Sequence, residues 1–500
     1  MKLRKKPHKP MRINDITIID DNKLKKAITA AALGNAMEWF DFGVYGFVAH
    51  ALGQIFFPSV SPGVQVIAAL ATFSVPFLIR PLGGIFFGAM GDKFGRQKVL
   101  SITIIMMAVS TFCIGLIPSY TVIGIYAPAL LLLAKLVQGF SVGGEYSGAV
   151  IFVAEYSPDR KRGFMSSWLD FGSIAGFVLG AGVVVLISSL IGEASFLIWG
   201  WRISFFIAAP LGIIGLYLRH ALEETPAFQQ YVNKLETEDC SSVEHLSRIS
   251  FIEITSKYWK SLLVCVGIVI STNVTYYMLL TYMPSYLAHN LHYSEDHGIL
   301  IIIAIMISML FVQPLIGLSS DRFGRKPFII GGSIGLVVLA IPCFILINSG
   351  IIGLMFFGLL ILAVLLNCFT GVIASILPAM FPTNIRYSAL AISFNISILV
   401  AGATPTVIAW LVEYTHNLYM PAYYLIVVAV IGLITGLYMK ETAKKPLRGA
   451  SPAASDQKEA KELLQETYDH IEQKVENINA QIADLENKKQ TLVDQHPKLD

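Results

Sequence analysis

Two carboxylates stand one helical turn apart in an otherwise apolar stretch, "LGNAMEWFDFGVYGFVA", residues 33–49. They are Glu38 and Asp41, and their spacing of three places them on one face of a helix. Ionisable side chains inside a membrane are costly and usually face a cavity. A carboxylate whose burial is balanced by a nearby cation can release and take up protons near neutral pH. The pair therefore predicts proton chemistry; the simpler alternative is that both acids only form structural ion pairs.

Four further ionisable residues interrupt apolar stretches, and all of them lie in the first half of the chain: Arg80, Lys135, Glu145 and Asp170. The two cations could balance the charges of Glu38 and Asp41 or bind the carboxylate of a substrate. Asp170 and Glu145 are further candidates for proton coupling. Glu145 lies ten residues from Lys135 on the same predicted helix, too far for a local pair, so a structural link to another helix is an equal alternative.

Aromatic residues are abundant near these charges. Aromatic faces are the best protein ligands for a cation that has no N–H groups. Arg80 and Lys135 could bind a carboxylate in the same region, and Asn273 adds a polar group. The alternative for each one taken singly is packing or contact with lipid. The aromatic candidates are Trp39, Phe40, Tyr45, Tyr146, Trp168, Tyr276 and Tyr277.

Membrane-spanning helices are the elements that must position these residues. The chain has 500 residues, of which 55% are hydrophobic and 14% charged, and its mean hydropathy is +0.64, too apolar for a soluble domain. Its net charge of +3 gives no general basic excess for nucleic acid, and its five scattered cysteines have no metal-ligand spacing. A bilayer core needs about 20 apolar residues per helix. Twelve such runs occur, at 27–57, 64–90, 99–118, 122–155, 164–192, 199–219, 258–289, 297–318, 328–348, 351–380, 387–415 and 420–440.

The placement of lysine and arginine predicts the orientation. Nine of them precede Ala27, and they recur in alternate connections, for example at 93–98, 160–162 and 322–326. The connections on the other side contain none. By the positive-inside rule, both termini are expected in the cytoplasm.

An internal repeat divides the chain into two halves. "GAMGDKFGRQK" (88–98) and "GLSSDRFGRKP" (317–327) share the pattern G-x-x-x-D-[KR]-F-G-R, 229 residues apart. Parallel repeats of six helices are a transporter architecture with the substrate site between the halves. We therefore expect a cytoplasmic segment at 1–26, a six-helix bundle at 27–219, a cytoplasmic loop at 220–257, a second bundle at 258–440, a linker at 441–455 and a coiled coil at 456–496.

The last segment is polar and carries a heptad pattern. Leu464, Ile471, Ile478, Leu485 and Leu492 recur every seven residues. The intervening core positions are filled by Tyr468, Val475, Ile482 and Lys489. A long helix with so narrow an apolar seam needs a partner, so the pattern predicts a homodimer through a coiled coil. The alternative is a single amphipathic helix packed on the transporter.

These motifs resemble the major facilitator superfamily. Within it, "GNAMEWFDF" and "KLVQGFSVGGEYSGA" are similar to the metabolite:proton symporter family, and the tail narrows the resemblance to its osmosensory members. The resemblance implies a twelve-helix all-α fold, and proton-coupled import of proline, glycine betaine and related solutes at high osmolality. It also implies a place among the lipids of a bacterial inner membrane. The loop residues Asp92, Arg96, Asp321 and Arg325 would act as a latch between the halves.

Other functions stay open at this stage. The sequence has no nucleotide-binding motif, and we expect no enzyme activity and no cofactor, only an ion gradient as the driving force.

Lys135 stands where the superfamily often has arginine. It keeps the positive charge but cannot donate the two parallel hydrogen bonds of a guanidinium group. The alternatives are a proton symporter for another organic acid, dicarboxylate or shikimate-like, and a membrane sensor that transports nothing.

Overall fold

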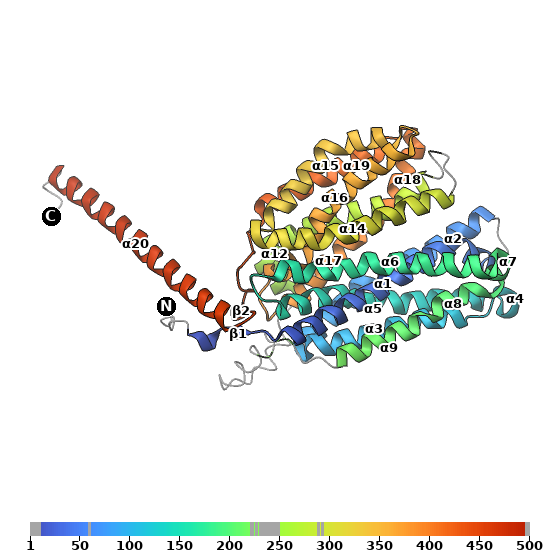
Figure 1. Cartoon of the computed structure of the whole chain (residues 1–500), viewed down its shortest axis with the longest axis horizontal. Helices are drawn as coiled ribbons and strands as arrows, with labels where there is room; N and C mark the ends of the chain where they lie inside the picture. Colours follow the sequence, from blue (N-terminus) through green and yellow to red (C-terminus); the bar gives the residue numbers. More distant parts are fainter. Residues whose placement is uncertain are drawn as a thin grey trace.

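The computed structural model describes residues 12–58, 62–220, 225, 229, 251–287, 291 and 295–495. Two helical bundles lie side by side, and one long helix projects from their common end (Figure 1). Most of the predicted loop at 220–257 lies outside the described residues.

The N-terminal bundle begins directly after a short strand. Ten helical segments stay within 21–220, several of them consecutive pieces of one membrane span. They are α1 (Asp21–Phe56), α2 (Pro62–Phe94), α3 (Arg96–Leu116), α4 (Tyr120–Ile123), α5 (Tyr126–Tyr156), α6 (Arg162–Ile191), α7 (Glu193–Ser195), η2 (Phe196–Gly200), α8 (Trp201–Phe206) and α9 (Ala208–His220).

The C-terminal bundle repeats this arrangement. Its spans are broken by proline and by short π-helical or 3₁₀ turns, as at η3 and η5. The segments are α12 (Phe251–Tyr276), η3 (Tyr277–Tyr282), α13 (Met283–Ser285), α14 (Glu295–Phe323), α15 (Lys326–Ile347), α16 (Ile352–Ile376), η5 (Leu377–Met380), α17 (Arg386–Gly402), α18 (Thr404–Thr415) and α19 (Met420–Tyr438).

The twelve-helix fold is confirmed. Within the described residues, ten helical segments are long and apolar enough to cross a membrane. Helices α1 and α2, with 36 and 33 residues, complete two sets of six. The internal repeat is visible in the backbone as well, because Gly95 and Gly324, 229 residues apart, both have positive φ (100° and 95°). Only glycine adopts that conformation without strain, and it lets the chain reverse between consecutive spans.

Close packing brings α6 against α1. A Cβ atom added at Gly172 would lie 2.3 Å from the carbonyl oxygen of Ala32, and one at Gly176 would lie 2.0 Å from that of Ala36. Only glycine permits this approach of two backbones in a membrane bundle. The contact fixes the helix that carries Glu38 and Asp41 against the helix that carries Asp170.

The tail leaves the bundles beside the N-terminus. Strand β1 (Thr17–Ile18) pairs in parallel with β2 (Ala453–Ala454), and helix α20 (Gln457–Gln495) follows β2. Only the first turns of α20 pack on the body, and its apolar seam is exposed further out, with Ile478 54% and Leu485 64% accessible. Helix α20 thus points away from the transporter (Figure 1), which does not support the alternative of a helix packed on its surface. We call the end of the bundles at β1 and β2 the tail face.

Candidate functional site

A small cavity lies between the two bundles and has a volume of about 30 Å³. That is room for about two water molecules. Helices of both halves contribute to its wall. The lining residues are Glu38, Trp39, Arg80, Tyr146, Asp170, Ser173, Thr272, Asn273, Tyr276, Tyr277, Thr370, Ile373, Phe394 and Ile398.

Glu38 and Arg80 form a buried ion pair in this wall. The distance from Arg80 Nη2 to Glu38 Oε1 is 2.7 Å, and each side chain is only 4% exposed. The guanidinium carbon of Arg80 also lies 4.9 Å from the ring centre of Phe77 and 5.3 Å from that of Phe42. Glu38 Oε2 and Arg80 Nε make no hydrogen bond within the described residues. The pair therefore presents one free acceptor and one free donor in a site of low dielectric constant.

Asp41 pairs with Lys135 outside this cavity. The distance from Lys135 Nζ to Asp41 Oδ2 is 3.0 Å, and the same ammonium donates to Gln138 Oε1 at 2.8 Å. The ring of Tyr45 lies 4.1 Å from Lys135 Nζ. A second small cavity, lined by Glu38, Asp41, Arg80 and Gln138 among others, connects the surroundings of the two pairs. Both acids thus form the ion pairs of the structural alternative, and each keeps one unbonded oxygen to which a proton can bind.

Asp170 and Glu145 have different environments. The hydroxyl of Tyr146 donates to Asp170 Oδ1 at 3.1 Å, and no cation of the described residues pairs with this carboxylate. Glu145 accepts a hydrogen bond from the hydroxyl of Thr103 and does not line the cavity. Asp170 is therefore the acid that faces the cavity without a cationic partner in the described protein.

Four of the seven predicted aromatic residues line the cavity. The ring centres of Trp39 and Tyr276 lie 4.8 Å apart, so this contact joins the two halves. Tyr146 stacks on Phe394 at 4.4 Å, again across the halves, and the hydroxyl of Tyr276 has no hydrogen-bond partner in the described residues. Tyr277 completes the set.

The remaining aromatic candidates lie elsewhere. Phe40 and Tyr45 belong to an apolar cluster within the N-terminal bundle. Phe40 follows Glu38 by two positions and therefore lies on another face of α1. Tyr45, seven positions after Glu38, lies on the same side of α1 but two turns further along, where its ring contacts Lys135. Trp168 packs against Phe164 and Phe171 on α6.

Six of the fourteen residues that line the cavity could not be predicted from the sequence. Thr370, Ile373, Phe394 and Ile398 come from α16 and α17, where nothing in the local sequence distinguishes them from other residues of an apolar span. Ser173 and Thr272 are small polar residues of a kind common in membrane helices. Only the packing of the two halves shows that these side chains face one cavity.

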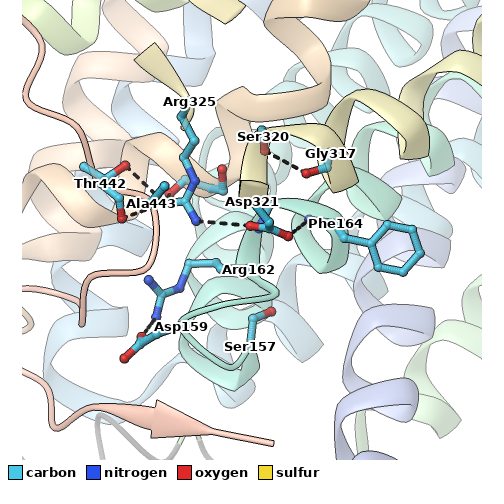
Figure 2. Close-up of polar contacts among 12 residues, drawn as sticks. Ser157, Asp159, Arg162, Phe164, Gly317, Ser320, Asp321, Arg325, Thr442 and Ala443 are labelled. Carbon is cyan, nitrogen blue, oxygen red and sulfur yellow. Dashed lines mark hydrogen bonds and ion pairs between the residues drawn. The ribbon is translucent and has the colours of Figure 1, made fainter. Parts of the chain in front are cut away.

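The repeated loops join the two halves at the tail face. Asp92, in the last turn of α2, accepts hydrogen bonds from the backbone N–H groups of Tyr387 and Ser388 at the start of α17 (3.2 and 2.9 Å). Asp321, its counterpart 229 residues later, accepts from those of Gly163 and Phe164 at the start of α6 (2.7 and 2.8 Å; Figure 2). The first N–H groups of a helix are otherwise unsatisfied and attract negative charge. Each half thus caps a helix of the other.

Buried arginines add to this junction. Arg386 of α17 pairs with Glu155 at the end of α5, and both side chains are completely buried. The distance from Arg325 Nη2 to Asp321 Oδ1 is 3.9 Å, and the Arg325 side chain points to the chain that follows α19 (Figure 2). The side chain of Arg96 lies outside the described residues. The two halves are therefore held together at the tail face by hydrogen bonds to the carboxylates of both repeats and by the Arg386–Glu155 ion pair.

Comparison with known proteins agrees with this architecture. The model of the sugar (and other) transporter family matches residues 27–453, and the model of the osmosensory transporter coiled coil matches residues 455–500. The chain belongs to the sugar (and other) transporter family. It is a multi-pass membrane transporter of the major facilitator superfamily with a C-terminal coiled-coil domain, not an enzyme.

Relatives of this transporter are similar over its whole length. It is 74% identical over 499 residues to the glycine betaine/proline/ectoine/pipecolic acid transporter OusA of Dickeya dadantii, covering 100% of both chains. It is also 74% identical over 498 residues to the proline/betaine transporter of Escherichia coli, again covering 100% of both. The proton:xylose symporter XylE bound to 6-bromo-6-deoxy-D-glucose shares the fold, with a TM-score of 0.71 and 19% identity over 89% of this chain and 100% of that one.

Proposed function

We propose that this transporter imports zwitterionic osmolytes such as proline and glycine betaine together with protons, and that high osmolality activates it. The names of its 74%-identical relatives support the substrate class. The observation that carries the proposal is the cavity wall, which combines Arg80, Asp170 and a set of aromatic rings between the two halves.

The cavity chemistry favours a zwitterion. The guanidinium of Arg80 can bind a carboxylate through two parallel hydrogen bonds. The faces of Trp39, Tyr276 and Tyr277 suit a quaternary or secondary ammonium group. Asp170, which has no cationic partner in the described residues, adds a negative charge for that end of the solute.

The same wall argues against a dicarboxylate or a shikimate-like anion. Such a solute would bring further negative charge next to Glu38 and Asp170 without supplying a cation, and like charges in a desolvated site are unfavourable. The family also favours a transporter over a sensor that transports nothing. At about 30 Å³, the cavity holds none of these solutes, so the halves must move apart to admit one.

Proton coupling follows from competition for Arg80. In this structure, Arg80 binds the carboxylate of Glu38. A proton on Glu38 Oε2 neutralises that carboxylate and frees the guanidinium for the carboxylate of the solute. After release of the solute on the other side, Glu38 loses its proton and pairs with Arg80 again. Binding of proton and solute is thereby linked, and no cofactor is needed.

The tail face is then the cytoplasmic face of a bacterial inner membrane. The basic loops around Lys93, Arg160 and Arg322 support this orientation by the positive-inside rule. The exposed seam of α20 supports a coiled-coil homodimer, because a long helix with an apolar seam is stable in water only with a partner. Lipids surround the exposed apolar faces of both bundles.

Uptake into proteoliposomes tests the proposal. Purified protein should accumulate labelled proline and glycine betaine when the lumen is alkaline relative to the bath, and more strongly as osmolality rises. A protonophore should abolish accumulation, and excess succinate or shikimate should not compete. Absence of uptake at every osmolality would contradict the substrate class. Uptake that ignores the pH gradient would contradict proton coupling.

A further inference from the structure

The segment that connects α19 to α20 crosses the tail face from one half to the other. It leaves the C-terminal bundle after Tyr438 and reaches β2, which pairs with β1 in front of the N-terminal bundle. We call residues 441–454 the strap. A flexible linker would make few contacts, but this one is hydrogen-bonded along most of its length.

Three buried arginines of the tail face donate to the strap. Arg325 donates to the carbonyl oxygen of Thr442 at 3.2 Å and to its hydroxyl at 3.1 Å (Figure 2). Arg162 donates to the carbonyl oxygen of Lys445 at 3.0 Å, and Arg386 donates to that of Arg448 at 2.8 Å. The three side chains are at most 2% exposed. If the strap left, buried guanidinium groups would lose acceptors, which is costly in such a site.

The start of the strap is fixed as well. Glu441 accepts hydrogen bonds from the backbone N–H groups of Arg325 (3.0 Å) and Lys326 (2.9 Å). Burial raises the pKa of Glu441, but backbone N–H groups around it outweigh this effect and lower that pKa overall. Burial, together with the nearby Arg162, lowers the pKa of Arg325 to about 10, so its side chain still carries its charge at neutral pH. Strap and arginine therefore meet as charged, hydrogen-bonded groups.

The far end of the strap is attached to the N-terminal half. Thr17 N–H donates to the carbonyl oxygen of Pro452 at 2.8 Å, and Ile19 N–H donates to that of Ala454 at 2.9 Å. Ala453 N–H donates to Asp159 Oδ2 at 3.0 Å, and Asp159 N–H donates to the carbonyl oxygen of Ala453 at 2.9 Å. The N-terminal strand and the loop before α6 thus bind the same three-residue segment, 452–454, from two sides.

The first turns of α20 extend this attachment. Arg160 forms ion pairs with Glu462 (2.8 Å) and Glu466 (2.6 Å). Hydrogen bonds to Glu462 and Glu466 raise the pKa of Arg160, although burial opposes the shift. A pull on the tail would therefore act first on the loop that leads into α6.

We propose that the strap is a closing device: with β1 as its clasp, it holds the two halves together at the tail face, and release of β2 from β1 and Asp159 is what lets the tail regulate opening. The halves must separate at this face for a solute to leave. Separation must break the bonds of the strap to one half or the other. The regulatory part rests on the proposed function, whereas the closing role does not.

The test measures opening without measuring transport. Ser320 is completely buried between α14 and α6 at this face. A Ser320→Cys reporter, in a background in which Cys113, Cys240 and Cys368 are replaced by serine, should react with a maleimide only when the halves separate. Ala453→Pro removes the N–H group that donates a hydrogen bond to Asp159. It should therefore raise the rate of maleimide labelling about fivefold or more. Ser451→Pro is the matched control, because the Ser451 N–H makes no hydrogen bond to a described residue, and it should leave the rate unchanged.

A second pair of variants guards against misfolding by proline. Arg160→Glu places a negative charge opposite Glu462 and Glu466 and should raise labelling about two- to fivefold. Lys161→Glu makes the same charge change one residue away, at an exposed side chain, and should not. Equal labelling in all four variants and the parent would overturn the inference. Failure of proline uptake in proteoliposomes would overturn the proposed function alone, since labelling needs no substrate.

Discussion

At the scale of single residues, the buried ion pairs are the features that stability does not explain. Replacing a buried pair by well-packed apolar residues is often neutral or stabilising. Removing one partner alone typically costs about 3–5 kcal/mol, because it leaves a buried charge. The pairs Glu38–Arg80 and Asp41–Lys135 therefore suit a role in which charge is gained and lost during the cycle.

The first prediction separates these two pairs. Glu38→Gln keeps the size of the side chain but cannot take up a proton, so gradient-driven uptake should fall about tenfold or more while solute exchange persists. Asp41→Asn lies outside the cavity and still accepts from Lys135, so it should affect driven uptake and exchange alike. Both rates are measured in proteoliposomes. If Asp41→Asn alone removed driven uptake and left exchange intact, the proton would belong to Asp41.

The sequence predicted the charged part of the site but not its wall. An acid or a cation is rare in an apolar span and draws attention by itself, as Glu38, Arg80 and Asp170 do. Phe394 and Ile398 carry no such mark, since their function depends on which helices of the other half they face. The sequence already pointed to Arg80 and Lys135 as partners of Glu38 and Asp41, but which acid pairs with which cation depends on the rotation of α1, α2 and α5 about their axes.

At the scale of elements, the contact of α1 with α6 positions the acids. The glycines of α6 let the backbone of α1 approach closely, so any added side chain there must push the helices apart. Glu38 and Asp170, on these two helices, would then move relative to each other. The packing of α1 on α6 therefore also sets the relative positions of the acids in the site.

The second prediction uses two glycines of α6. Gly176→Ala places a Cβ atom 2.0 Å from the carbonyl oxygen of Ala36 and should destabilise the protein by about 1–3 kcal/mol, the usual cost of overpacking. At Gly182→Ala the added Cβ meets no atom of the described residues within 4 Å, so this variant should leave stability unchanged or slightly higher. Thermal unfolding in detergent measures both. Equal midpoints for the two variants would contradict the packing argument.

Long periodic elements could be predicted, whereas short ones could not. Apolar runs, the repeated loop and the heptads each extend over many residues, and the twelve helices and α20 follow from them. Strands β1 and β2 have two residues each and exist only because the strap brings Ala453 beside Thr17. No local sequence pattern predicts such a pairing. Likewise, the linker at 441–455 has the composition of a flexible segment, and only the buried arginines order it.

At the scale of the whole molecule, the two halves are related by their own repeat. Asp92 caps a helix of the C-terminal half and Asp321 caps one of the N-terminal half, so the junction at the tail face is nearly symmetric. The cavity lies between the same two halves, further from the tail face than this junction. One rocking motion would open the junction and enlarge the route to the cavity together, which is what alternating access requires.

The last prediction concerns the dimer. Ile478 lies in the exposed seam of α20 and Ala480 lies on its polar side, so aspartate at these positions tests the seam with a matched control. A charge in a coiled-coil core is desolvated without a partner, so Ile478→Asp should weaken dimerisation about tenfold or more, whereas Ala480→Asp should not. Light scattering in detergent gives the dimer fraction. In proteoliposomes, Ile478→Asp and removal of residues 456–500 should both shift the osmolality needed for activation while uptake itself remains. A wild-type activation curve in either variant would mean that the paired tail does not set the threshold.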